Sequence, residues 1–111
     1  MKLAVPLVLA AAGLGATAFT SVASADEPVP VFDVGPGCHA ATALMSLDPE
    51  RSKRCMEDEG SARAEVAKQW IGFPVDDRRR CSKVAQLDGS PSYVDLLECL
   101  TLAREARVTP D

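Results

Sequence analysis

The stretch DPERSKRCMEDEGSARAEVAKQWIGFP, residues 48–74, decides the fold of this chain. Asp48-Pro49 is a typical helix start, because an acidic residue caps the free N–H groups and proline fits the first helical position. Further along, apolar residues recur at steps of three or four positions: Ala62, Val66, Trp70 and Phe73. This spacing places them on one face of a helix, and Pro74 ends the pattern. We therefore predict a long helix over residues 49–72.

Shorter helices are expected on both sides of the long one. Residues 38–46, CHAATALMS, are rich in alanine and predict a short helix. Residues 76–86 begin with two acids and are followed by Asp88-Gly89, which predicts a helix that ends there. Residues 91–106 begin with serine caps and a proline, and an acid follows Ser92 at the capping-box spacing. Because no β-type alternation occurs, the fold class is predicted as all-α: a small disulfide-stapled bundle of about three helices.

Residues 1–25 have the parts of a secretory signal peptide. Lys2 supplies the positive charge, an apolar stretch follows, and Ala23-Ser24-Ala25 is the small-x-small pattern that signal peptidase cuts. We expect export to the periplasm and no membrane span in the processed chain. Residues 26–37, DEPVPVFDVGPG, hold three prolines and two glycines and predict an extended, flexible lead-in. The helical domain is expected over residues 38–108.

Four cysteines stand in the expected domain: Cys38, Cys55, Cys81 and Cys99. An even number of cysteines in a small exported domain favours disulfides. The sequence contains no C-x-x-C pair, so a zinc site or a redox pair is not expected. If the last two helices each reverse direction, the 1.5 Å rise per residue of a helix brings Cys81 and Cys99 to the same height. We therefore predict the pairs Cys38–Cys55 and Cys81–Cys99, with pairing across the two halves as the alternative.

Charge and motifs argue against several classes of function. The chain has 12 basic and 16 acidic residues, and loss of Lys2 with the signal peptide changes its formal charge from −4 to −5, which argues against nucleic acid. The one histidine, His39, stands beside a cysteine that is expected to be oxidised, so a Cys/His nucleophile pair is not expected. We predict a non-enzymatic protein. The run Arg78-Arg79-Arg80 is interpreted as a solvated, partly self-neutralised helix face, with partner docking as the alternative.

Acidic residues close to the cysteines are candidate ligands of a hard metal cation: Glu57, Asp58, Glu59, Asp95 and Glu98. Hard cations bind carboxylate oxygens, and a neighbouring disulfide lowers the entropy lost when such ligands are ordered. The spacing is not that of an EF-hand loop. An ordinary acidic, solvated surface is the alternative interpretation.

Several residues between positions 55 and 107 follow a pattern shared by one protein family. They include Cys55-Met56, Trp70, Phe73-Pro74, Cys81 and the stretch PSYVDLLECL at residues 91–100. On these residues the chain resembles a family of small exported four-cysteine helical proteins of alphaproteobacteria. The family usually has amide or neutral residues around the positions of Glu57, Asp58 and Glu98, where this chain has carboxylates.

One characterised type within that family binds lanthanide ions in the periplasm. The resemblance therefore implies a periplasmic binding protein that holds a lanthanide through surface carboxylates. A shallow site leaves coordination positions for water or a second protomer, so a metal-linked homodimer is a corollary. The rival expectation is a small periplasmic adaptor or inhibitor that docks a protein partner without metal, through the arginine run or an exposed apolar strip.

Overall fold

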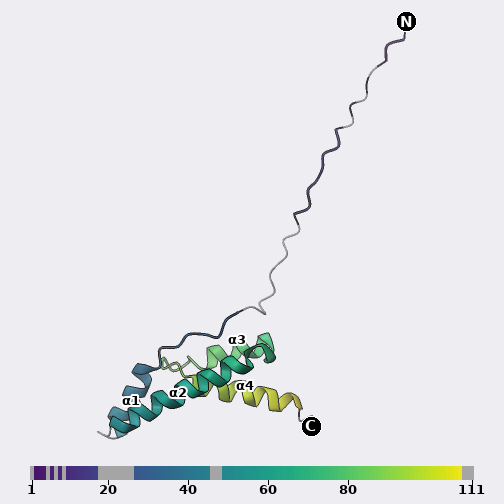
Figure 1. The fold of residues 1–111 in the computed structure, drawn as a ribbon. Coiled ribbons are helices and arrows are strands. Elements are labelled where there is room, and N and C mark those ends of the chain that lie inside the picture. Colours follow the sequence, from purple (N-terminus) through teal and green to yellow (C-terminus); the bar gives the residue numbers. More distant parts are fainter. Residues whose placement is uncertain are drawn as a thin grey trace.

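The structure is a computed structural model that describes residues 2–4, 6, 8, 10–17, 27–45 and 49–108. These residues form four α-helices and one short 3-10 helix, without a strand (Figure 1). The helices are α1 (Gly35–Met45), α2 (Pro49–Gln69), η2 (Trp70–Gly72), α3 (Val75–Val84) and α4 (Tyr93–Val108). The all-α prediction is confirmed. The bundle has four α-helices rather than about three, since the short helix predicted over residues 38–46 is present as α1 and adds to the three longer predicted helices.

The predicted signal peptide, residues 1–25, is described only in part. Its described residues, all between positions 2 and 17, form neither helix nor strand and are exposed. The predicted cleavage position before Asp26 lies outside the described residues. Within the described ranges, none of the helices combines the length and the apolar composition that a bilayer crossing requires.

The long helix predicted from the sequence is α2 with its extension η2. It begins at Pro49 and runs through Gly60 without a break, while the predicted cap Asp48 lies outside the described residues. After Gln69 the backbone tightens into η2, and the N–H of Phe73 donates to the carbonyl oxygen of Trp70 at 3.2 Å. The predicted apolar face is confirmed, because all four of its members are buried: Ala62, Val66, Trp70 and Phe73.

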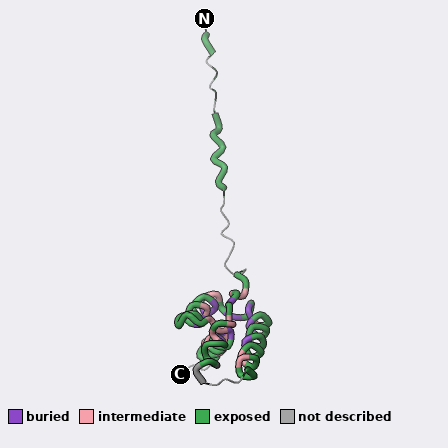
Figure 2. Tube along the Cα trace, turned by 90° about the vertical axis from the view of Figure 1, so that its left-hand side faces the viewer, coloured by how far each residue is buried: buried purple, intermediate pink, exposed green. Residues whose placement is uncertain are grey.

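α4 lies at the centre of the packing. It packs against both α2 and α3, and α1 packs against α2. Figure 2 shows the buried residues concentrated where the helices face one another. The core cluster contains Phe32, Ala62, Val66, Trp70, Phe73, Cys81, Ala85, Tyr93, Leu96 and Leu100. Each larger side chain in such a core stabilises the fold by about 1.5–3 kcal/mol through burial.

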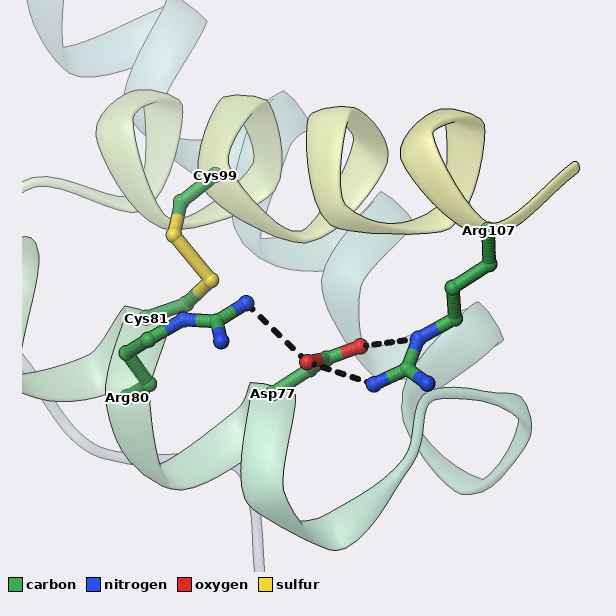
Figure 3. The surroundings of a disulfide bond; sticks show 5 residues. All are labelled: Asp77, Arg80, Cys81, Cys99 and Arg107. Carbon is green, nitrogen blue, oxygen red and sulfur yellow. Dashed lines mark hydrogen bonds and ion pairs between the residues drawn. A yellow bond between two sulfur atoms is a disulfide. The ribbon is translucent and has the colours of Figure 1, made fainter. Parts of the chain in front are cut away.

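Both predicted disulfides are present. Cys38–Cys55 joins α1 to α2 with 5.6 Å between the Cα atoms, and Cys81–Cys99 joins α3 to α4 with 5.5 Å (Figure 3). The bonded cysteines are 17 and 18 positions apart in the sequence. Loops of this length are each worth about 3 kcal/mol in the chain-entropy model, which matters for a core this small.

Residues 27–34 belong to the segment that the sequence predicts as an extended lead-in. This segment, here called the N-terminal strap, is extended but lies against the core, and α1 already begins at Gly35. Phe32 is buried, and its ring centroid lies 4.8 Å from that of Tyr93. The Tyr93 hydroxyl accepts a hydrogen bond from the N–H of Phe32 at 2.7 Å and donates to the carbonyl oxygen of Pro30 at 2.8 Å. Because these contacts satisfy backbone polar groups and bury an aromatic ring, they hold the strap in place.

A second contact fixes the start of the strap. Trp70 donates from its indole Nε1 to the carbonyl oxygen of Glu27 at 2.7 Å. The partners in these strap contacts stand 43 to 63 positions apart, so the local proline and glycine content does not reveal them.

Candidate functional site

The three consecutive arginines of α3 have separate roles and do not form one basic face. Arg78 is buried, and its guanidinium lies 5.3 Å from the ring centroid of Trp70. Arg79 forms an ion pair with Glu27 of the N-terminal strap at 2.9 Å. Arg80 forms an ion pair with an acid three positions earlier on its own helix, so the predicted partial self-neutralisation is confirmed for this residue. The predicted solvated face is wrong for Arg78, because its side chain is buried. The contacts of these arginines therefore stabilise the fold, and the run does not present a continuous basic surface to a partner.

Asp77 is the acid that Arg80 contacts, and it ties α3 to α4 (Figure 3). Its side chain is buried, yet Arg107 of α4 donates to it from Nε at 3.1 Å and from Nη2 at 2.9 Å. The hydrogen bond from Arg107 lowers the pKa of Asp77 below its ordinary value, against the opposing effect of burial. Sequence reasoning did not single out this residue. The available signal was an acid in the first helical turn with an arginine three positions later.

A groove open to solvent runs between α3 and α4 and has a volume of about 530 Å³. We call it the α3–α4 groove. Its lining residues are Arg80, Val84, Asp95, Glu98, Cys99, Leu102 and Ala103. Val84 is 46% exposed and Leu102 is 57% exposed, although the sequence places both on the apolar sides of their helices.

Two of the five predicted metal ligands, Asp95 and Glu98, line this groove one helical turn apart. Partial burial raises the pKa of Asp95, and repulsion from Asp88, Glu59 and Glu98 adds to that rise. Neither Asp95 nor Glu98 forms an ion pair with another side chain in the described part of the protein. This end of the groove therefore carries negative charge that no ion pair among the described residues neutralises.

The other three predicted ligands are placed differently. The buried carboxylate of Glu59 accepts hydrogen bonds from the Ser92 hydroxyl at 2.5 Å and the Tyr93 N–H at 2.6 Å, so it caps α4. Glu57 and Asp58 are exposed on α2. Among the described residues, which include all five acids, no three His, Cys, Asp or Glu side chains form a group that could hold a metal ion. The structure brings Asp95 and Glu98 together and uses Glu59 for the fold.

The site is thus a surface groove with apolar walls and an acidic end. His39 is exposed on α1 and is not among the residues that line the groove. No protein-family model, curated protein sequence or solved structure matches the chain. The described residues establish a small four-helix protein with two disulfides.

Proposed function

We propose that this chain is a non-enzymatic periplasmic protein that docks a protein partner in the α3–α4 groove. The observation that supports the proposal is the exposure of Val84 and Leu102 on facing helices, where both line one groove. Small-molecule sites enclose most of the ligand surface, whereas a groove that is open to solvent suits a segment of another protein. The predicted signal peptide at residues 1–25 supports the periplasmic location.

Affinity capture from a periplasmic extract tests this function. The unchanged protein and two separate single variants serve as baits. Leu102→Ser removes an apolar wall of the groove, and Leu87→Ser removes a more exposed leucine that does not line it. We expect the unchanged protein and Leu87→Ser to retain the same partner, with or without chelator, and Leu102→Ser to lose it. Retention of that partner by Leu102→Ser contradicts docking in this groove.

A second candidate function is binding of a hard cation, and in particular a lanthanide ion. Burial is the largest cause of the raised pKa of Asp95, and repulsion from Asp88, Glu59 and Glu98 adds to it. That repulsion favours the cation function, because a bound cation relieves it. The resemblance of residues 55–107 to the family that includes landiscernin, a periplasmic lanthanide-binding protein, points the same way. Hard cations such as Ca²⁺ take about six to eight oxygen ligands. Asp95 and Glu98 together supply only part of that coordination shell. Water or a second protomer would complete it, which leads to a metal-linked homodimer.

Calorimetric titration with La³⁺ and Ca²⁺ tests the cation function. The double variant Asp95→Asn with Glu98→Gln should lose binding, and the matched variant Glu57→Gln with Asp58→Asn should retain it. Glu59 is left unchanged in both, because its carboxylate caps α4. Absence of binding below millimolar concentration, or equal loss in the two double variants, contradicts a cation site at the acidic end of the groove.

A further inference from the structure

We infer that the partner segment in the α3–α4 groove is a basic amphipathic helix, with apolar side chains on Val84 and Leu102 and with lysine or arginine facing Asp95 and Glu98. This inference rests on the docking function proposed above and specifies the chemistry of the partner. It follows from three observations on the groove: its charge balance, the spacing of its acidic and apolar parts, and the charge of the chain as a whole.

Acidic residues outnumber basic ones among the described residues that line the groove. Arg80 is the one basic residue there, against Asp95 and Glu98, and its Nη2 lies 3.0 Å from the carboxylate of Asp77, which Arg107 also binds. Figure 3 shows the Arg80 guanidinium directed toward Asp77. Asp95 and Glu98 have no comparable partner within the described residues, and Asp88 lies close enough to raise the pKa of Asp95. A partner with positive charge at this end complements the groove and relieves the repulsion.

The acidic and apolar parts follow one another along α4. Leu102 stands four positions after Glu98 and seven after Asp95, and all three line the groove. At 1.5 Å per residue, these separations are about 6 Å and about 10.5 Å along the helix axis. A partner helix with a basic residue four or seven positions from an apolar one has the same spacing. The groove therefore favours partner helices by the order of their basic and apolar residues as well as by their composition.

A second copy of this chain is a poorer occupant than a basic helix. After loss of the signal peptide the expected chain carries a formal charge of −5, and each copy contributes the same carboxylates at the groove. Like charges brought together at an interface oppose association. Charge complementarity thus favours a different, basic partner.

The test is a binding titration of fluorescently labelled peptides with the oxidised, exported protein. The basic probe is an 18-residue amphipathic helix with leucine on one face and lysine beside it. Two matched probes replace every lysine with glutamine or with glutamate. We expect the basic probe to bind in a salt-dependent manner, the glutamine probe about tenfold more weakly, and the glutamate probe not at all, since tenfold corresponds to one favourable charged contact of about 1.4 kcal/mol.

Protein variants locate the binding. Asp95→Asn with Glu98→Gln should weaken binding of the basic probe about tenfold and flatten its salt dependence, and Leu102→Ser should weaken it by about the same factor. The matched controls Glu57→Gln with Asp58→Asn, and Leu87→Ser, should leave the affinity within about twofold. Equal melting temperatures for all variants show that the fold is retained.

Three results overturn the inference. If Glu57→Gln with Asp58→Asn weakens binding as much as the groove variants do, the attraction is non-specific electrostatics. If the glutamine probe binds as tightly as the basic probe and Leu102→Ser abolishes both, the groove docks proteins but does not select basic ones, so the docking function stands without this inference. If the peptides do not bind and sedimentation shows a concentration-dependent dimer that Leu102→Ser removes, the occupant is a second copy.

Discussion

The carboxylate of Glu59 on α2 accepts a hydrogen bond from the backbone N–H of Tyr93 at the start of α4, with 2.6 Å between Oε2 and N. Its other oxygen accepts from the hydroxyl of Ser92 at 2.5 Å. Glu59 and Tyr93 are 34 positions apart in the sequence, so the cap of α4 comes from another helix rather than from the preceding loop alone. A negative charge at this end of a helix is also favoured by the helix dipole. Glu59 therefore sets where α4 begins relative to α2.

Replacing Glu59 with glutamine should destabilise the protein by about 1–2 kcal/mol, because charge-assisted hydrogen bonds to buried groups are lost or weakened. The matched control is Asp58→Asn at the exposed neighbouring position, for which a change within about 0.5 kcal/mol is expected. Urea unfolding measures both. Equal stabilities for the two variants would show that the cap contributes nothing to folding.

Tyr93→Phe should loosen the N-terminal strap while it keeps the aromatic contact with Phe32. The change removes the hydroxyl that bridges the N–H of Phe32 and the carbonyl oxygen of Pro30. A buried N–H without an acceptor costs about 1–3 kcal/mol. Hydrogen exchange should show faster exchange of the Phe32 amide, with amides in the middle of α2 little changed. An unaltered Phe32 exchange rate argues that the strap is held by ring packing alone.

Asp77→Asn should destabilise the protein by about 2 kcal/mol at neutral pH, because the buried carboxylate loses its charge-assisted hydrogen bonds from Arg107 and Arg80. The neighbouring exposed residue provides the control: Asp76→Asn should change the free energy of unfolding by less than about 0.5 kcal/mol. Chemical unfolding at pH 7 distinguishes the two variants. A loss of similar size in both would assign the effect to the helix end and not to the ion pairs.

The pH dependence of stability follows from the lowered pKa of Asp77. A carboxyl whose pKa is lower in the folded state stabilises the fold fully above its unfolded pKa, and this contribution is lost as the pH falls through the folded pKa. The ordinary value is 3.8, so the stability difference between the unchanged protein and Asp77→Asn should be constant at neutral pH and shrink below that value. Urea unfolding at a series of pH values measures the difference. A difference that grows on acidification contradicts the lowered pKa.

Removal of either disulfide by paired Cys→Ala changes should cost about 3 kcal/mol, since the two loops are of nearly equal length. Loss of Cys81–Cys99 should cost more than loss of Cys38–Cys55. The reason is that Cys81 belongs to the core cluster, so its replacement also removes buried contacts. Denaturant unfolding of the two variants gives the comparison. The reverse order would mean that attachment of α1 matters more than packing around Cys81.

The amino-acid sequence by itself determined the helical elements and favoured one cysteine pairing, which the structure confirms. The spacing of Ala62, Val66, Trp70 and Phe73 predicted the buried face of the long helix, because helical periodicity is a local property of the chain. The pairing of Cys81 with Cys99 followed from helix length and reversal of direction, and the structure confirms it.

Only the tertiary structure decided which individual side chains are buried, which cap a helix and which line the groove. Glu59, Asp95 and Glu98 are all acids in the sequence, yet one caps α4 and the other two line a groove. The N-terminal strap is held by partners 43 to 63 positions away, and its own composition suggests flexibility. The physical reason is that burial, hydrogen bonding and charge pairing depend on which surfaces meet in space, whereas periodicity and caps depend on neighbours along the chain.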